Sequence, residues 1–171
     1  ATMEIRDIKS FLDYLGSVHQ RTRRVVLCIP PAHLEWTPVE GRFTCGELVR
    51  HLAGVERWMY GETVQGRPSA YPGHGSNLAE GFDAVLTYYD RLHEESRAIF
   101  SALTDEALQA KCPTPAGASI TTWKWLRAMI EHEAHHRGQL YLMLGLQGVA
   151  TPPMYGLTAQ EVHARSVRRD K

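Results

Sequence analysis

Apolar residues recur along this chain at the spacings of amphipathic helices. In the first such stretch they are Ile5, Ile8, Phe11, Leu12, Leu15, Val18, Val26 and Ile29. Steps of three, four and seven residues place side chains on one face of a helix. The pattern returns three more times, and we predict helices over about residues 4–29, 44–65, 78–103 and 122–147.

The first two predicted helices have clear end signals. Pro30 and Pro31 end the first helix, because proline cannot continue the backbone hydrogen bonds of a helix. Thr44 and Glu47 at the start of the second helix form a capping box, in which each side chain accepts a hydrogen bond from the other residue's backbone N–H. We therefore expect this second helix to begin at a well-defined position.

The later helices are separated by longer connections. Residues 66–77 are rich in Gly, Pro and Ser and are long for a bundle loop, which permits a crossover along the bundle and leaves the direction of the next helix open. Asn77, followed by Glu80, predicts the start of the third helix, and Thr121 or Thr122 predicts the start of the fourth.

These elements predict an all-α fold. No convincing alternating strand is present, so we expect a four-helix bundle with a long crossover connection between its second and third helices. A single domain is expected to cover residues 1–171, with a C-terminal tail over residues 157–171. The charged end, residues 165–171, has no interleaved aromatic residue and is interpreted as a solvated tail and not as a nucleic-acid arm.

Composition removes several classes of partner. The chain has 171 residues, with 19 Lys and Arg against 19 Asp and Glu. A formal net charge of +0 gives no electrostatic reason to bind nucleic acid or an anionic membrane. No stretch is apolar enough for a membrane span, no secretory signal is recognisable, and the three cysteines lack CxxC spacing. We expect a reducing, cytoplasmic setting, and Cys28 is expected to be inert.

Three of the nine histidines lie on apolar helix faces at the spacing of a metal site. His132 and His136, four residues apart, stack one turn apart on the inner face of the fourth helix, and His51 lies on the inner face of the second. Each buried imidazole needs a partner for two ring nitrogens. A divalent metal would supply one partner for all three and keep an open coordination position, as catalytic metal sites do. The alternative for each residue is an ordinary hydrogen-bonded core histidine.

The remaining histidines give weaker signals. His19 and His93 lie on the apolar faces of the first and third helices, as core residues or as residues that support the site or contact substrate. His135 lies at the edge of the apolar stripe and is a poorer ligand. Three others, in loops or in the tail, are expected to be solvated. They are His33, His74 and His163.

The segment from His132 to His136 also satisfies the zincin pattern H-E-x-x-H. The longer metzincin pattern requires a third histidine where this chain has Leu142, and Gly138 lies one residue too early for it. No predicted strand is available to hold an extended peptide, so the sequence disfavours a peptidase. Glu133 projects into the apolar arc and is a candidate for proton transfer or for supporting a ligand.

Three segments together resemble one known family. They are His51 within Gly46–Glu56, His132 to His136 followed by Arg137-Gly138-Gln139, and the closing stretch from Gly148 to Gly156. This combination resembles the DinB-like, or YfiT-like, metal-binding bundles. The resemblance implies a four-helix bundle with an atypical crossover, and a divalent metal, usually zinc or nickel, held by His51, His132 and His136.

The resemblance also implies an activity. Family members with known activity are similar to thiol-dependent transferases and isomerases that use bacillithiol or mycothiol, and others are known only as candidate metal-dependent hydrolases. The family name refers to DNA-damage-inducible expression, which implies a stress-response setting and not polymerase activity. No residue of this chain matches a thiol-binding or substrate-binding motif, so those residues stay unassigned.

We therefore expect a metal-dependent enzyme that transfers a low-molecular-weight thiol to an electrophilic small molecule. A thiol at the open coordination position would lose its proton, whereas a water at the same position would give hydrolysis. Two alternatives stay open, a hydrolase that uses a metal-bound water and a non-catalytic bundle that binds a metal or a small ligand. The expected partners are a small-molecule substrate and a second copy of the chain in a homodimer.

Overall fold

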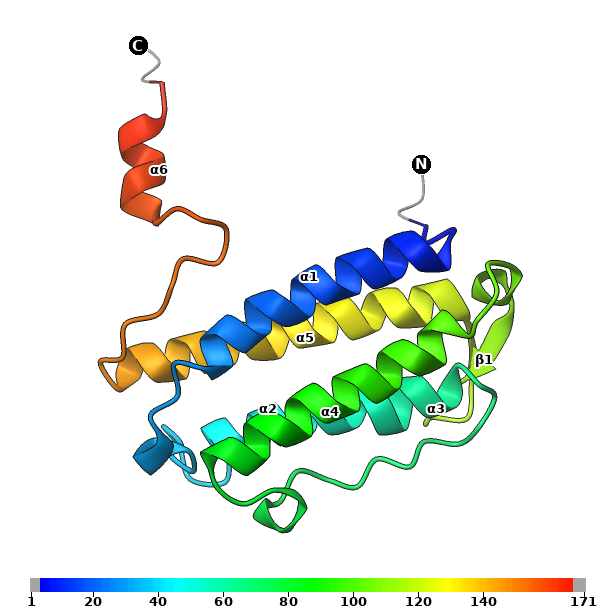
Figure 1. Cartoon of the computed structure of the whole chain (residues 1–171), viewed down its shortest axis with the longest axis horizontal. Coiled ribbons are helices and arrows are strands. Elements are labelled where there is room, and N and C mark those ends of the chain that lie inside the picture. The colour runs from blue at the N-terminus through cyan, green and yellow to red at the C-terminus, as the bar shows by residue number, and fades with distance from the viewer. Residues whose placement is uncertain (1–3, 168–171) are drawn as a thin grey trace.

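Four long helical segments dominate the fold (Figure 1), and the computed structural model describes residues 4–167. The main helices are α1 (Ile8–Val26), α2 (Cys45–Gly54), α3 (Gly61–Thr63), α4 (Phe82–Ser101), α5 (Thr122–Leu146) and α6 (Ala159–Arg165). Single 3₁₀ turns cover Pro31–His33, Ser76–Leu78 and Glu106–Gln109. The predicted four-helix architecture is confirmed, with α2 and α3 joined into one rod by a π-helical turn over Val55–Tyr60.

The predicted crossover runs along the side of the bundle. After α3, residues 64–81 return along its length, so that α4 starts at the same end as α2 and the two helices run in parallel (Figure 1). Helix α4 packs against α2 and α1, and α5 packs against α1 and α2. The interface of α2 with α5 and the interface of α1 with α4 therefore lie on different sides of the bundle.

Helix ends follow local chemistry. Asp7 caps α1 by accepting a hydrogen bond from the backbone N–H of Ser10, and α1 ends at Val26, three residues before the expected end at residue 29. The capping box of Thr44 and Glu47 is confirmed, with both reciprocal hydrogen bonds present.

The predicted start of the third helix at Asn77 is wrong. Ser76–Leu78 forms a separate 3₁₀ turn, and the chain then extends at Ala79. Helix α4 begins only at Phe82, because Gly81 has a φ of +84°, which breaks the helical path and favours glycine.

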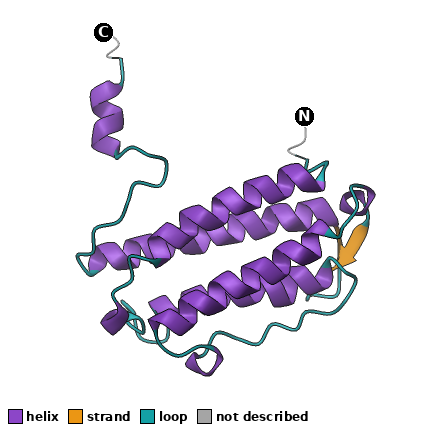
Figure 2. Cartoon of the chain, viewed as in Figure 1, coloured by secondary structure: helices purple, strands orange, loops and turns teal. Residues whose placement is uncertain are grey.

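A short hairpin is an element that the sequence pattern did not predict. Strand β1 (Lys111–Pro113) pairs antiparallel with β2 (Ser119–Thr121), and Cys112 lies opposite Ile120 (Figure 2). Three residues per strand are too few to show an alternating pattern. The hairpin leads directly into α5, whose N-cap is Thr121 without a side-chain hydrogen bond.

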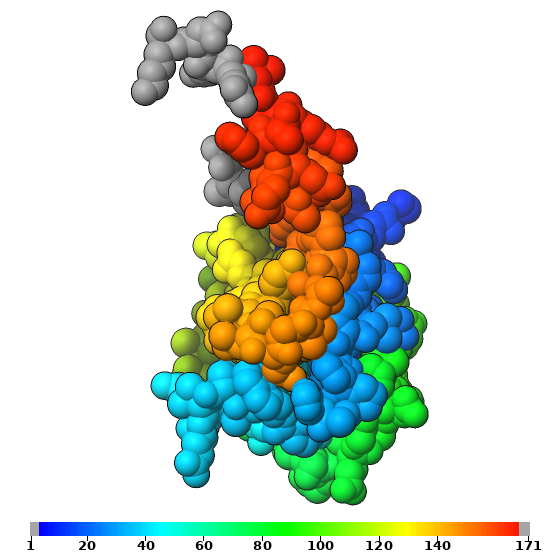
Figure 3. All heavy atoms as spheres, turned by 90° about the vertical axis from the view of Figure 1, so that its left-hand side faces the viewer, coloured from blue at the N-terminus to red at the C-terminus, as the bar shows by residue number. Residues whose placement is uncertain are grey.

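The C-terminal segment differs in part from the predicted solvated tail. Residues Ala159–Arg165 form helix α6, which a capping box of Thr158 and Glu161 starts. This helix projects beyond the bundle and buries no side chain (Figures 1 and 3). The exposure expected of the tail is thus observed over the described part, and residues 168–171 lie outside the described residues. None of the helices in residues 4–167 is both long and apolar enough to cross a membrane.

Candidate metal centre

Three histidines from two helices converge where α2 packs against α5. One ring nitrogen from each of His51, His132 and His136 lies within 4.8 Å of the others, and this is the one such group of metal-binding side chains among residues 4–167. The Nε2 atoms of His51 and His132 are 3.1 Å apart. The rings of His132 and His136 lie one turn apart on α5, with centroids separated by 4.4 Å. The structure therefore brings together the three histidines that the sequence pattern selected.

Hydrogen bonds on the outer side of the rings orient them. His136 Nδ1 lies 2.7 Å from Gln139 Oε1, and since an amide oxygen only accepts, Nδ1 carries the proton and Nε2 keeps a lone pair. His51 Nδ1 lies 2.6 Å from the Tyr71 hydroxyl, which lies 2.9 Å from His74 Nδ1. A consistent assignment has His51 donating to Tyr71 and Tyr71 donating to His74. The Nε2 lone pair of His51 then faces the cluster.

Burial keeps the three imidazoles neutral. Desolvation, together with the neighbouring His132 and His136, lowers the pKa of His51 to about 3. Desolvation also lowers the pKa of His132 to about 4, and it lowers the pKa of His136. Neutral imidazole is the form that binds a metal ion. The chemistry and the orientation of these donors thus fit a divalent cation such as zinc or nickel.

An aromatic side chain lies beside the cluster. The Phe43 ring centroid is 4.9 Å from that of His51, 5.7 Å from that of His136 and 4.8 Å from that of His74. Phe43 belongs to the connection before α2 and is half-buried. It shields one side of the cluster from water.

The crossover supplies residues that the sequence pattern missed. His74, expected to be solvated, is half-buried and bonded to Tyr71 beside His51, so that expectation is wrong. Gly54 in α2 permits the close approach of this segment, since an added Cβ would lie 3.2 Å from Tyr71 Cε2. A Gly- and Pro-rich sequence is typical of an exposed loop, and it gave no signal that the segment returns to the site.

Arg50 fixes the crossover in place. Its fully buried side chain donates from Nε to the carbonyl of Ala79 at 2.9 Å and from Nη1 to the carbonyl of His74 at 3.3 Å. It also forms an ion pair with Glu35, whose other oxygen accepts from the Thr44 hydroxyl. A single side chain next to His51 thus ties two loops to α2.

Comparison with known proteins identifies the family. The model of the DinB superfamily matches residues 14–140, which include all three histidines. The chain belongs to the DinB superfamily.

Relatives of this DinB-superfamily chain are distant in sequence and close in fold. The protein YjoA of Bacillus subtilis (strain 168) is 24% identical over 125 residues, covering 72% of this chain and 79% of YjoA. The crystal structure of YjoA, a DinB-like protein, covers 86% of this chain and 97% of its own, with a TM-score of 0.70 and 22% identity.

Two further solved structures share the fold. One is YfiT from Bacillus subtilis, which is described as a probable metal-dependent hydrolase with an unusual four-helix bundle topology. It has a TM-score of 0.68 and 18% identity, and the match covers 88% of this chain and 94% of the YfiT chain. A mycothiol-dependent maleylpyruvate isomerase has a TM-score of 0.62 and 15% identity over 78% of this chain and 60% of its own. At these identities the similarity establishes the fold of the DinB-superfamily chain.

Glu133, the predicted proton-transfer residue, lies in a second polar cluster inside the bundle. Its Oε1 accepts a hydrogen bond of 3.0 Å from the Tyr89 hydroxyl. Burial, together with the nearby Glu56 carboxylate, raises the pKa of Glu133 to about 7. Glu56 belongs to the π-helical turn after α2, and such turns are frequent at functional sites. The Oε1 atom of Glu56 lies 3.0 Å from His93 Nδ1.

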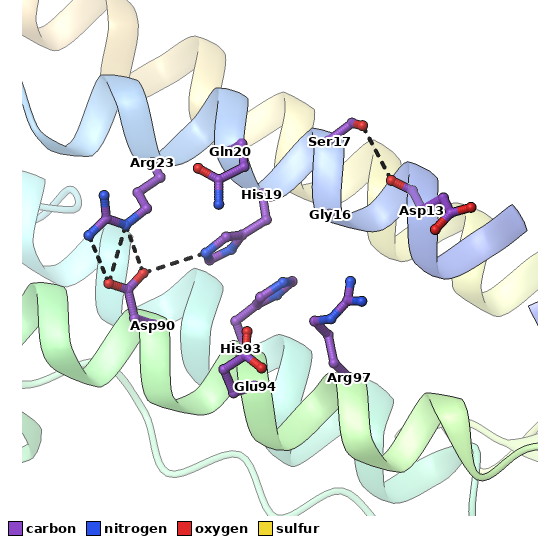
Figure 4. Close-up of a pocket in the computed structure, with 10 residues that line it drawn as sticks. All are labelled: Asp13, Gly16, Ser17, His19, Gln20, Arg23, Asp90, His93, Glu94 and Arg97. Carbon is purple, nitrogen blue, oxygen red and sulfur yellow. Dashed lines mark hydrogen bonds and ion pairs between the residues drawn. The ribbon is translucent and has the colours of Figure 1, made fainter. Parts of the chain in front are cut away.

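His19 and His93 extend this polar cluster from Glu56 to a cavity between α1 and α4. Their rings stack with centroids 3.6 Å apart and planes 8° apart, and Tyr89 stacks on the other side of His19 at 4.5 Å. They line a cavity of about 640 Å³, in which Asp90 lies 3.5 Å from His19 Nε2 and pairs with Arg23 (Figure 4). His19 Nδ1 is buried without a hydrogen-bond partner among residues 4–167. These two histidines are therefore separate from the three-histidine cluster.

The remaining candidates have no part in the cluster. His33, His135 and His163 are exposed, as expected for His33 and His163. The ring of His135 lies outside the three-histidine cluster, with its Nε2 3.4 Å from Gln139 Nε2. Burial raises the pKa of the Cys28 thiol, which is opposite to the shift that activates a cysteine nucleophile.

Proposed function

We propose that this protein is a divalent-metal-dependent enzyme that transfers a low-molecular-weight thiol, of the bacillithiol or mycothiol type, to an electrophilic small molecule. The observation that carries the proposal is the convergence of three neutral imidazoles within 4.8 Å. Three protein ligands leave a coordination position for a reactant, which is typical of catalytic metal sites. The mycothiol dependence of one structural neighbour supports a thiol as that reactant.

His51, His132 and His136 would hold the cation, with zinc or nickel as its identity. The chemistry that a bound divalent cation supplies is a lowered pKa of a thiol or a water at the open position. The chain's own groups prepare the site. Tyr71 and Gln139 fix the protonated nitrogens of two ligands, and Phe43 limits the access of water.

Glu133 is proposed to hold or release a proton near the site. It follows His132 directly in α5, and it is buried with a hydrogen bond to Tyr89. A carboxyl group inside the bundle can exchange a proton that the bulk solvent does not reach.

Hydrolysis is the second candidate, because the structural neighbour YfiT is described as a probable metal-dependent hydrolase. The two functions share their metal ligands and differ in the nucleophile, which is a thiol in one and a water in the other. Incubation of the zinc- or nickel-loaded protein with benzyl chloride, with and without bacillithiol, separates them. Thioether formation only in the presence of thiol supports transfer, whereas thiol-independent release of chloride contradicts it and supports hydrolysis.

Elemental analysis tests the ligands themselves. Replacing His51, His132 and His136 together by Ala should abolish the bound metal. A control variant with two exposed histidines outside the cluster, His33 and His163, replaced by Ala should keep it. Equal metal content in both variants would contradict the site.

A further inference from the structure

Two cavities flank Phe43 beside the three-histidine cluster, and they differ in chemistry. The first, which we call the apolar cavity, has a volume of about 350 Å³. Its apolar lining consists of Pro38, Phe43, Leu48, Leu142, Met143 and Leu146. The second, which we call the polar cavity, has a volume of about 550 Å³. Its polar lining consists of Thr37, Glu40, Arg42, Thr44, Glu47 and His74.

The apolar cavity adjoins the candidate metal centre through two residues. Gln139 lines it and is hydrogen-bonded to His136 Nδ1. Phe43 lines it and lies 5.7 Å, between ring centroids, from His136. A molecule in this cavity is therefore close to one of the three imidazoles, on the same side of the bundle.

The walls of the apolar cavity combine buried and exposed apolar surface. Leu48 and Met143 are almost completely buried, whereas Leu142 and Leu146, one turn apart on α5, are 64% and 61% exposed. Covering two large exposed leucines with an apolar molecule is favourable by about 25 cal/mol for each Å² removed from water. The volume lies at the lower end of the range for small-molecule sites, about 300–1,000 Å³, so that it suits a compact group such as one aromatic ring.

We propose that the apolar cavity binds the apolar part of the electrophilic substrate, and that Phe43 separates it from the polar cosubstrate. This inference rests on the proposed function, since a thiol transfer needs two different molecules at one centre. Phe43 contacts the rings of His51, His74 and His136 and lines both cavities. The polar cavity, with Glu40, Thr44 and His74, suits the hydrophilic body of a low-molecular-weight thiol, and Arg42 lines both cavities at their common border. The substrate class is thus a compact apolar electrophile, such as a benzylic or alkyl halide.

A binding measurement tests this subsite without metal or turnover. Protein labelled with ¹³C at its methionine methyl groups is titrated with toluene, an inert apolar probe. We expect the Met143 signal to shift and saturate, while the signals of Met59, Met129 and Met154, which line neither cavity, stay in place. The absence of a Met143 shift would overturn the proposal.

A matched pair of variants locates the binding. Leu142→Glu puts a charge in the apolar cavity and should weaken toluene binding at least about tenfold, because the contact of one leucine is worth more than 1.4 kcal/mol. Leu27→Glu changes a comparably exposed leucine, 47% exposed, at the end of α1 and should leave binding unchanged. Equal effects of the two substitutions would contradict the subsite.

Kinetics separate this inference from the proposed function. In the metal-loaded protein, Leu142→Glu should raise KM for benzyl chloride and leave KM for bacillithiol unchanged. A Met143 shift without any thiol-dependent turnover would leave the subsite in place and overturn the transferase function. Turnover without a Met143 shift, and with an unchanged KM for benzyl chloride in the variant, would overturn the subsite alone.

Discussion

The Nε2 atoms of His51 and His132 face each other at 3.1 Å, although the two residues are 81 positions apart in the chain. The other ring nitrogen of His51 is occupied by Tyr71, so the lone pair of Nε2 points into the cluster. Two neutral imidazoles with lone pairs at this distance repel one another unless a proton or a cation lies between them. The fold therefore holds the three side chains together before any ion binds, with one imidazole N–H between these two nitrogens in the place that a cation would take.

Addition of a divalent cation should consequently stabilise the protein. Zinc or nickel at about 100 times its dissociation constant should add about 2.7 kcal/mol to the free energy of unfolding, which raises Tm by about 5–10 °C for a chain of this size. Differential scanning calorimetry of the chelator-treated protein measures this shift. The same shift in the His51→Ala variant would place the bound ion elsewhere.

Tyr71 should tune the affinity for the metal from outside the cluster. Tyr71→Phe removes the hydroxyl that links His51 Nδ1 to His74 Nδ1. Loss of such an outer hydrogen bond typically lowers metal affinity by about 10–100-fold. Competition with a chromogenic chelator measures the change, and Tyr14→Phe, at a tyrosine that is 53% exposed, is the control. Equal affinities of the two variants would mean that Tyr71 does not orient His51.

Arg50 should matter for stability more than any exposed arginine. Arg50→Met would leave the carbonyls of His74 and Ala79 without their donor and Glu35 without its cation. Breaking such a buried pair costs about 3–5 kcal/mol, and we expect the lower end because Glu35 itself reaches solvent. Urea unfolding measures the loss. Arg6→Met, at an arginine whose side chain is 78% exposed, should change stability by less than about 1 kcal/mol, and a similar loss in both variants would contradict the anchoring role.

The sequence predicts the three-histidine cluster well because all three side chains lie on regular helices. For His132 and His136 the helical period fixes their relative direction, and the apolar neighbours of His51 give its face. Nothing beyond helix packing is needed to bring the three together. The capping box of Thr44 and Glu47 was predictable for the same reason, since both of its hydrogen bonds are local.

The sequence predicts poorly what depends on contacts distant in the chain. The sequence places His74 in a solvated loop, because the distant contacts that help to bury it come from Arg50 in α2 and from Phe43 before α2. The π-helical turn that carries Glu56 also has no sequence signal, since its extra residue changes the helix period only locally. The Gly81 break before α4 is visible in the sequence only once the direction of the crossover is known.

His19 should make stability depend on pH. Burial, together with the adjacent His93, lowers the pKa of His19 to about 3, and Asp90 partly opposes this shift. The unfolded chain, with the ordinary value near 6.5, therefore binds more protons than the native state between these two pH values, and stability falls as the pH falls through this window.

The contribution of His19 is about 1 kcal/mol per pH unit below 6.5. Urea unfolding in EDTA at pH 7, 6 and 5 should show a smaller loss of stability for His19→Asn than for the natural chain. Burial alone would lower the pKa of His93, but its hydrogen bond to Glu56 raises the pKa above its ordinary value. The contribution of His93 to stability therefore has the opposite pH dependence to that of His19, and it is present in both proteins. An identical pH dependence of the two proteins would contradict the assignment to His19.

Glu133→Gln should separate proton transfer from structural support. Glutamine has nearly the same size, and its amide oxygen can still accept the hydrogen bond from the Tyr89 hydroxyl, but it cannot hold or release a proton. We expect unchanged metal content and an unchanged KM for the thiol, with kcat for thiol transfer lowered about 100-fold, since a general acid or base contributes at least that factor. Glu131→Gln changes an exposed glutamate of the same helix and is the matched control. If Glu133→Gln retained full kcat, Glu133 would serve the packing of the bundle and not the transfer of a proton.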